Sequence, residues 1–275
     1  MTSLDQIDGW DVPHAAAAVL TPTAVLETTG DTARQFPLAS VSKVLAAVTF
    51  HVAVEEGSIA LDDPTGPEGS TVRHLLAHAS GLAPDGDLQV LGPPGKKRIY
   101  SNLGFEELGR HVEAATGMSY EEYARLALVD SLGLAGTDVS GSPAHAHRST
   151  VDDLVVVLQA VTAHRLLAPT TLEQMTTPAF PDLAGVLPGF GKQDPNPWGL
   201  GVEVRGNKSP HWTSPRNSPR TWGHFGRSGT FVWFDPGAGH DGTGLGLVVL
   251  TDRDFDQWAV DAWPPLASAV LQEHA

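Results

Sequence analysis

The spacing of apolar positions changes twice along the chain and divides it into three parts. Residues 15–20 and 24–28 are short apolar runs separated by a turn that contains proline, a pattern typical of strands. From residue 41 to residue 56 the apolar positions recur at helical spacing, and Gly57 is suited to end that helix. Because apolar residues occupy nearly all of its faces, we expect this helix to be buried on nearly all sides.

The middle of the chain is helical and rich in loops. Its spacing and capping residues predict helices at residues 71–78, 102–116, 120–129 and 150–161, with another beginning at Pro169. After these helices, residues 181–219 are rich in glycine, proline and asparagine. We therefore expect this segment to form a long surface excursion.

Strand patterns return in the last third of the chain. Runs of β-branched and aromatic residues at 198–204, 230–234 and 244–251 lie between turns rich in glycine. Residues 258–273 then predict a final helix that Pro264 and Pro265 interrupt.

Strands at both ends and helices between them predict an α+β fold. We expect one antiparallel sheet formed by the N- and C-terminal segments, flanked by helices, with a mostly α-helical domain inserted. The predicted boundaries are 1–62 and 198–275 for the discontinuous sheet domain and 63–197 for the inserted domain.

Composition narrows the possible functions. The 275 residues carry a formal net charge of −15, which disfavours nucleic acid and anionic lipid as partners. The chain has no cysteine, which excludes disulfides, thiolate metal sites and a cysteine nucleophile. Residues 1–14 lack the basic and apolar parts of a secretory signal, and no apolar stretch is long enough to span a bilayer. We therefore expect a cytoplasmic protein that does not bind membranes.

The first candidate for chemistry is the segment Ser40-Val-Ser-Lys43, at the start of the predicted buried helix. Side chains three residues apart lie on nearly the same helical face. Ser40 would lie near unpaired helix N–H groups, which favour a developing oxyanion, and a desolvated Lys43 could act as a base. The alternative is that Ser40 or Ser42 caps the helix and Lys43 extends to solvent.

Two further segments contain residues of catalytic types. Tyr100 could relay a proton, and the side chain of Asn102 could bind both a carbonyl and an ammonium group. His224 could donate to a tetrahedral intermediate or to a carboxylate, and Gly226 would allow a ligand to approach the backbone closely. Taken singly, each segment is better explained by helix capping or by packing than by catalysis.

In this order, Ser-x-x-Lys, Tyr-x-Asn and His-x-Gly resemble the three-motif signature of the serine β-lactamase and penicillin-binding-protein superfamily. The resemblance is greatest to the class C β-lactamase-like branch, which includes D-aminopeptidases, D,D-peptidases and family VIII carboxylesterases. It also covers residues 36–43, 55–64, 71–82 and 149–154.

This resemblance implies a role for each motif residue. Ser40 would be the nucleophile and Lys43 its proton acceptor. Tyr100 would be a candidate base for acylation and for activating water in deacylation, and Asn102 would orient Lys43 and the substrate. The backbone N–H groups of Ser40 and Arg227 would form the oxyanion hole.

The sequence departs from true β-lactamases in the third motif. His224 stands where those enzymes usually have lysine, and Phe225 stands where they have threonine or serine. The hydroxyl that holds the lactam carboxylate is therefore missing, although Arg227 or Ser228 could compensate. A segment like the glutamate-bearing loop of class A enzymes is also missing. Both departures argue against efficient β-lactam hydrolysis.

Rival signals are weaker. Residues 226–230 lack the final glycine of an α/β-hydrolase nucleophile elbow. His145 and His147 have no third ligand at metal-site spacing, and residues 242–246 resemble a phosphate loop but lead into a predicted strand. Four aromatic residues of the last third could line a substrate pocket or fill the core: Trp198, Trp212, Trp222 and Phe225.

The sequence thus predicts a serine hydrolase that forms an acyl-enzyme on Ser40 and hydrolyses a small ester or amide. The first alternative is a β-lactamase, D,D-peptidase or D-aminopeptidase, and the second is a catalytically silent relative that binds an acyl or peptide ligand. We predict no cofactor and no metal. The partner would be a small-molecule ester, amide or β-lactam, and the oligomeric state is not predicted.

Overall fold

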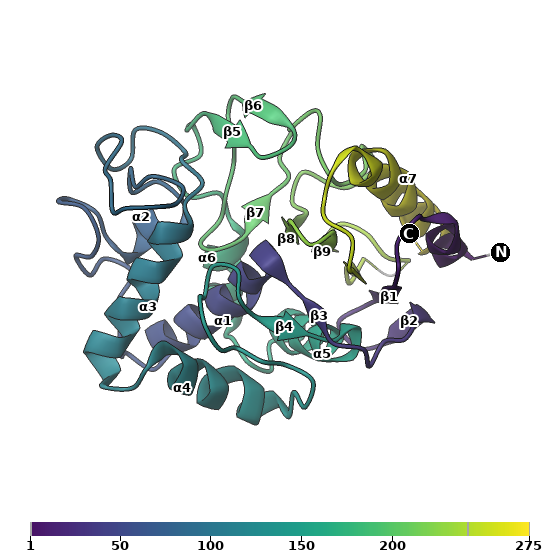
Figure 1. The fold of residues 1–275 in the computed structure, drawn as a ribbon, viewed down its shortest axis with the longest axis horizontal. Coiled ribbons are helices and arrows are strands. Elements are labelled where there is room, and N and C mark those ends of the chain that lie inside the picture. The colour runs from purple at the N-terminus through teal and green to yellow at the C-terminus, as the bar shows by residue number, and fades with distance from the viewer. Residues whose placement is uncertain (1, 241, 275) are drawn as a thin grey trace.

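Six antiparallel strands form the central sheet of the computed structural model, which describes residues 2–240 and 242–274 (Figure 1). The strand order is β2-β1-β10-β9-β8-β7. The strands are β1 Ala15–Leu20, β2 Val25–Gly30, β7 Glu203–Val204, β8 Trp222–Gly226, β9 Thr230–Asp235 and β10 Leu245–Thr251. Both ends of the chain contribute strands, which confirms the predicted α+β fold. Met1, Asp241 and Ala275, which fall within the predicted sheet domain, lie outside the described residues.

Seven helices are arranged around this sheet within the described residues. They are α1 Ser42–Glu55, α2 Val72–Leu76, α3 Asn102–Thr116, α4 Tyr120–Ala124, α5 Val151–Thr162, α6 Pro169–Thr176 and α7 Gln257–His274. A π-helical turn, Arg125–Asp130, continues α4. Two further antiparallel pairs lie outside the central sheet: β3 Phe36–Pro37 pairs with β4 Arg148–Ser149, and β5 Gly185–Leu187 forms a hairpin with β6 Gly191–Gln193.

Both faces of the sheet are covered at its centre, which explains why β1 and β10 are almost continuously apolar. Ala16, Ala18 and Leu20 of β1 pack in one core with side chains from α1 and α5. The alternate residues Ala17 and Val19 pack in a second core with side chains from α7. Figure 1 shows α7 on one side of the sheet and α1 and α5 on the other.

Helix α1 belongs to two cores at once. Its Val44, Leu45 and Val48 face the sheet, and its Ala46 and Phe50 face α2, α3 and α4. This double burial is the one predicted for residues 41–56, and the observed helix is shorter by one residue at each end. The division of the chain at residues 62/63 and 197/198 stays a prediction.

The structure corrects two predictions. Residues 181–219 do not form a surface excursion, because they supply β5, β6 and β7 and place Trp198 and Trp212 in the interior. The final helix is not interrupted, because α7 continues through Pro264 and Pro265. These two prolines lie toward solvent while Trp263 and its neighbours pack on the sheet. The carbonyls that lose a helical donor can therefore be hydrated.

The predicted strand at 198–204 is also shorter than expected, since only Glu203–Val204 joins the sheet. The backbone before it turns at Gly201, whose φ of 101° belongs to the left-handed region. A Cβ atom at Gly201 would lie 2.3 Å from Cβ of Ala47. The chain therefore bends there to pass close to α1.

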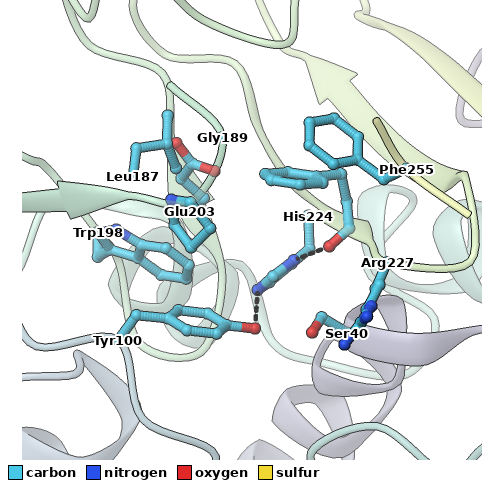
Figure 2. Close-up of a pocket in the computed structure, with 11 residues that line it drawn as sticks. Ser40, Tyr100, Leu187, Gly189, Trp198, Glu203, His224, Arg227 and Phe255 are labelled. Atoms are coloured by element: carbon cyan, nitrogen blue, oxygen red, sulfur yellow. Dashed lines mark hydrogen bonds between the residues drawn. The ribbon is translucent and has the colours of Figure 1, made fainter. Parts of the chain in front are cut away.

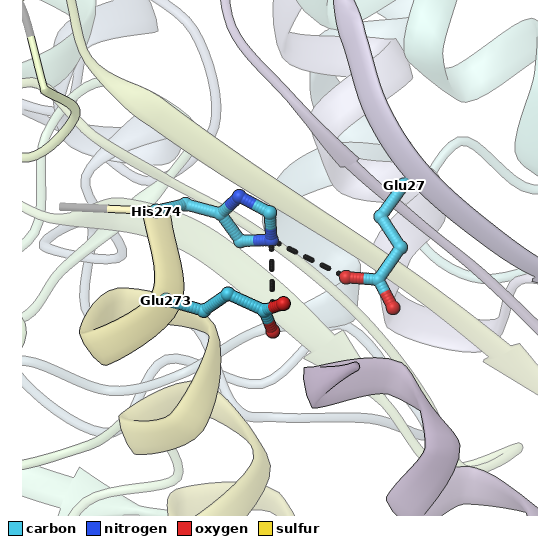
Figure 3. Close-up of side chains that lie close together, drawn as sticks. All are labelled: Glu27, Glu273 and His274. Atoms are coloured by element: carbon cyan, nitrogen blue, oxygen red, sulfur yellow. Dashed lines mark hydrogen bonds and ion pairs between the residues drawn. The ribbon is translucent and has the colours of Figure 1, made fainter. Parts of the chain in front are cut away.

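The two ends of the chain are joined by a small polar cluster. The carboxylate of Glu27 accepts hydrogen bonds from the N–H of Leu4 at 3.1 Å and from His274 Nε2 at 3.2 Å (Figure 3). The carboxylate of Glu273 accepts from the N–H of Ser3 at 2.6 Å. Glu27, Glu273 and His274 also form a group of potential metal ligands. Since both carboxylates already accept protein hydrogen bonds, we assign the cluster to joining the termini.

None of the helices in the described ranges combines the length and the apolar character that crossing a membrane requires.

Candidate active site

One cavity brings together candidate residues that lie far apart in the sequence. Its volume is about 320 Å³, and Ser40, Tyr100, His224 and Arg227 all line it (Figure 2). The other lining residues are Leu187, Pro188, Gly189, Trp198, Glu203, Phe225 and Phe255. Residues 181–219, which were predicted to form a surface excursion, therefore supply much of the cavity wall.

Ser40 lies in a 3-10 turn that leads into α1. The residue before it, Ala39, has a φ of 46°, a left-handed conformation that is unfavourable for alanine. The turn is held from the sheet, because the Thr230 hydroxyl donates to the carbonyl oxygen of Leu38 at 2.9 Å. Tertiary contacts thus hold a strained turn that presents Ser40 to the cavity.

Gly226 ends β8 directly against this turn. A Cβ atom at Gly226 would lie 2.3 Å from the carbonyl oxygen of Leu38 and 2.5 Å from Oγ1 of Thr230. Only glycine therefore allows the strand to approach the Ser40 turn this closely. This approach involves the protein's own backbone, whereas the sequence had suggested approach of a ligand.

Replacing Gly226 with alanine is expected to push β8 away from the Ser40 turn. We expect a loss of about 1–3 kcal/mol in the free energy of unfolding and a fall in the reactivity of Ser40 by more than about tenfold. Chemical denaturation and the rate of active-serine labelling measure the two effects. Gly9→Ala is the matched control, because a Cβ at Gly9 meets no atom within 4 Å. Equal effects of the two substitutions would contradict the role assigned to Gly226.

Lys43 is fully buried one helical turn beyond Ser40. Its Nζ donates to Oδ1 of Asn102 at 2.5 Å and to the carbonyl oxygen of Ala144 at 2.8 Å. It also lies 4.7 Å from the centre of the Tyr100 ring. The structure thus places Lys43 and Asn102 in direct contact and rules out a Lys43 that extends to solvent.

Burial lowers the pKa of Lys43 to about 7, and the negative charges of two nearby carboxylates offset burial only in part. An exposed lysine titrates near 10.4, so at neutral pH this one has a large fraction of uncharged amine. An uncharged amine can accept a proton from a neighbouring hydroxyl.

Tyr100 and His224 face each other across the cavity, with 3.4 Å between the phenol oxygen and Nε2 (Figure 2). Nδ1 of His224 lies 2.6 Å from the carbonyl oxygen of Phe225, which can only accept, so Nδ1 carries the proton. Burial, with the charge of Lys43, lowers the pKa of His224 to about 3. At neutral pH His224 is therefore uncharged, and its Nε2 accepts from Tyr100.

The phenol of Tyr100 is the poorer base of the two candidates. Burial raises the pKa of Tyr100 well above its usual value, and a hydrogen bond with Ser40 offsets burial only in part. Near pH 7 the tyrosine is thus a neutral phenol that can donate or relay a proton, while Lys43 has the better-matched pKa.

Sequence reasoning missed a buried ionic cluster behind the cavity wall. Oε1 of Glu203 accepts from Lys208 Nζ at 2.6 Å and from His211 Nε2 at 2.9 Å, and Oε2 accepts from Trp212 Nε1 at 2.8 Å. Burial alone would raise the pKa of Glu203, but Lys208 and His211 hold it far below its usual value. The carboxylate charge at the wall is therefore compensated. In the sequence this cluster is visible only as a glutamate, a lysine and a histidine between tryptophans. Their spacing does not predict that these side chains contact one another.

The remaining sequence candidates take other places. Trp198 and Phe225 line the cavity, whereas Trp212 and Trp222 pack in the two cores beside the sheet. His145 is exposed, but the ring of His147 is buried and stacks on Tyr120 at a centroid distance of 5.9 Å.

The chain matches the family model described as Beta-lactamase over residues 9–271. It belongs to the Beta-lactamase family. A crystal structure described as a beta-lactamase (Mb2281c) from Mycobacterium bovis is 50% identical, covers 99% of both chains and superposes with a TM-score of 0.95. The hydrolase EstCE1, described as having promiscuous acyltransferase activity, is 17% identical over 98% of this chain and 96% of its own, with a TM-score of 0.76. That likeness concerns the fold.

A curated relative, the uncharacterized protein BpOF4_21049 of Alkalihalophilus pseudofirmus (strain ATCC BAA-2126 / JCM 17055 / OF4), is 36% identical over 98 residues. The match spans 32% of this chain and 29% of that relative, so it concerns a segment of each. The family assignment confirms the resemblance that the three motifs indicated. The chain has the β-lactamase fold, which is a fold of hydrolases.

Proposed function

We propose that this protein is a serine hydrolase that forms an acyl-enzyme on Ser40 and hydrolyses small, uncharged esters or amides. One observation carries the proposal: the buried amine of Lys43, with its pKa lowered to about 7, lies one helical turn from a serine that opens into the cavity. A hydroxyl beside a base of matched pKa is the arrangement required for nucleophilic catalysis.

In the proposed acylation, Lys43 accepts the proton of the Ser40 hydroxyl while Oγ attacks the carbonyl carbon. The backbone N–H groups of Ser40 and Arg227 stabilise the oxyanion. When the tetrahedral intermediate collapses, the alcohol or amine leaves with the proton from Lys43, relayed by the Tyr100 phenol. Water then attacks the acyl-enzyme while Lys43 accepts one of its protons. Collapse of the second tetrahedral intermediate releases the acid, and Lys43 returns the proton to Oγ of Ser40.

The cavity lining supports the substrate class. Leu187, Trp198 and Phe225 provide apolar walls, and the charge of Glu203 is compensated by Lys208. His224 is uncharged at neutral pH, because its pKa is lowered to about 3. Apart from Arg227 at the edge, an acyl group that enters this cavity therefore meets apolar surface and no charged side chain without a compensating charge.

A series of p-nitrophenyl esters tests this reading. We expect kcat/KM to rise about tenfold from acetate to butyrate, since each buried CH₂ group contributes about 0.8 kcal/mol. A glutarate half-ester, of comparable length but negatively charged, is expected to be hydrolysed at least about tenfold more slowly than the butyrate. Equal rates for the charged and uncharged esters would overturn the assignment of an uncharged acyl group.

A β-lactamase is the second candidate, because the 50% identical structure carries that description. The side chain of Arg227 is exposed at the edge of the same cavity and could bind the carboxylate of a lactam. Incubation with a fluorophosphonate and with a chromogenic cephalosporin, followed by measurement of the intact mass of the protein, distinguishes an esterase from a β-lactamase. Rapid cephalosporin turnover without esterase activity would reverse our ranking, and absence of both labelling and turnover would favour a binding protein.

A further inference from the structure

The backbone around Tyr100 is anchored to one buried histidine. The carbonyl oxygen of His78 accepts from the N–H of Ile99 at 2.9 Å. The side chain of the same histidine, through Nδ1, accepts from the N–H of Ser101 at 3.1 Å. His78 thus binds the residue before Tyr100 and the residue after it.

The chain after His78 continues this attachment. The Ser101 hydroxyl donates to the carbonyl oxygen of Ala83 at 2.6 Å, and the N–H of Asn102 donates to that of Pro84 at 2.8 Å. Residues 78–84 therefore hold the backbone of the segment that contains Tyr100 and Asn102 in place. The sequence predicted a helix at residues 71–78 and a family resemblance at residues 71–82, but no role for His78 at the site.

The imidazole also supports the phenol directly. The ring of His78 is 1% exposed and contacts both Tyr100 and Trp198, with centroid distances of 4.7 Å to each. Tyr100 and Trp198 both line the cavity. His78 itself stands behind them, so it can act on a substrate only through these two side chains.

The hydrogen bond defines the protonation state of His78. Since the Ser101 N–H donates to Nδ1, the proton of the neutral ring lies on Nε2. Burial and the charge of Lys43 hold the pKa of His78 well below its usual value. Protonation of Nδ1 would remove the acceptor on which the Ser101 N–H depends.

The backbone of His78 is itself strained. Its φ of 52° lies in the left-handed region, which is uncommon for residues other than glycine and which asparagine, aspartate and histidine adopt more often than the rest. Such outliers persist where the surrounding structure fixes them and are frequent near active sites. Here the conformation lets the carbonyl oxygen and the ring of one residue reach both sides of Tyr100.

We propose that His78 is a positioning residue of this hydrolase: its carbonyl oxygen and Nδ1 fix the backbone on both sides of Tyr100, and its ring holds the phenol between Ser40 and His224. This inference deepens the proposed function and rests on it. Loss of the Nδ1 acceptor releases the Ser101 N–H and lets the phenol move. A displacement of about 1 Å at a catalytic group can lower the rate about 100-fold.

Two substitutions separate the acceptor from the ring. In His78→Asn the amide oxygen can replace Nδ1 as acceptor, and asparagine tolerates a positive φ. In His78→Phe the ring remains but the acceptor is lost. We expect His78→Asn to keep kcat for p-nitrophenyl butyrate within about tenfold of the wild type. For His78→Phe we expect kcat to fall about 100-fold with KM changed less than about threefold.

His51→Asn and His51→Phe form the matched control pair. His51 is 0% exposed, and its hydrogen bond joins Nε2 to the carbonyl oxygen of Leu200 at 3.0 Å. Both control variants are expected to lower the melting temperature and to leave kcat within about threefold. The proposal is overturned if folded His78→Phe retains the wild-type kcat, or if His78→Asn and His78→Phe are equally impaired.

A measurement on the wild type keeps the proposal testable if the variants do not fold. In ¹⁵N NMR spectra we expect Nε2 of His78 to carry the proton and Nδ1 to show hydrogen-bond coupling to the Ser101 amide. A proton on Nδ1 would overturn the positioning role alone, while Ser40 would still be labelled by a fluorophosphonate. A wild-type protein that is neither labelled nor active would overturn the proposed function and, with it, the catalytic role of His78.

Discussion

Replacing Ser40 with alanine is expected to abolish hydrolysis. We expect kcat for p-nitrophenyl butyrate to fall by about four to six orders of magnitude, because the acyl-enzyme cannot form without the hydroxyl. The covalent mass shift with a fluorophosphonate should disappear as well. The fold should be kept, since Ser40 is only half-buried and its side chain opens into the cavity.

The neighbouring serine supplies the control. Ser42 lies in the same segment, but its hydroxyl accepts from the N–H of His147 at 3.1 Å inside the protein. Ser42→Ala leaves that buried N–H without a partner, at a cost of about 1–3 kcal/mol, and should leave fluorophosphonate labelling intact. Labelling that survives Ser40→Ala and is lost in Ser42→Ala would assign the nucleophile to Ser42.

The fold could be predicted because its strands and helices have distinct apolar spacing. β1 is a continuous apolar run since both of its faces are covered, and α1 has apolar residues on nearly every side since it lies between two cores. These are local patterns with one structural solution each. Where spacing carries less information, as at residues 198–204, the predicted strand was too long.

The motifs predicted the candidate site residues, but the physical state of these residues depends on contacts that no local pattern contains. A pKa near 7 for Lys43 follows from its complete burial. The need for glycine at position 226 follows from the approach of β8 to Leu38, which is distant in the sequence. The role of His78 likewise depends on hydrogen bonds to a segment about twenty residues further along the chain.

The segment 181–219 shows where composition misleads. Glycine and proline indicated a solvated loop, yet its turns fold back and bury Trp198 and the Glu203–Lys208 pair. Charged residues are almost never fully buried unless they are paired. Here Lys208, His211 and Trp212 reach Glu203 from within the same irregular loop, which has no periodicity. Neither the burial nor the cavity wall could be predicted from spacing.

Replacing Lys43 with methionine is expected to lower the acylation rate by about two to four orders of magnitude, the usual contribution of a general base. In the wild type, kcat/KM should rise with pH through a midpoint near 7, since the uncharged amine is the base and the pKa of Lys43 is about 7. Lys43→Met should lose this acidic limb. Stopped-flow acylation with p-nitrophenyl butyrate between pH 5 and pH 9 measures both effects.

The same titration should be visible in stability, because burial lowers the pKa of Lys43 in the folded chain, and a shared midpoint would link the acidic limb of kcat/KM to Lys43. The pKa of Lys43 falls from its usual value of 10.5 to about 7 in the folded chain. Between these values the unfolded state binds more protons, so the Lys43 contribution to stability rises with pH over that window. Below pH 7 both states hold the proton, and burial of the ammonium costs its full amount. Lys43→Met should therefore flatten this part of the stability profile as it removes the acidic limb of kcat/KM. A Lys43→Met variant with wild-type acylation and an unchanged acidic limb would transfer the role of base to Tyr100.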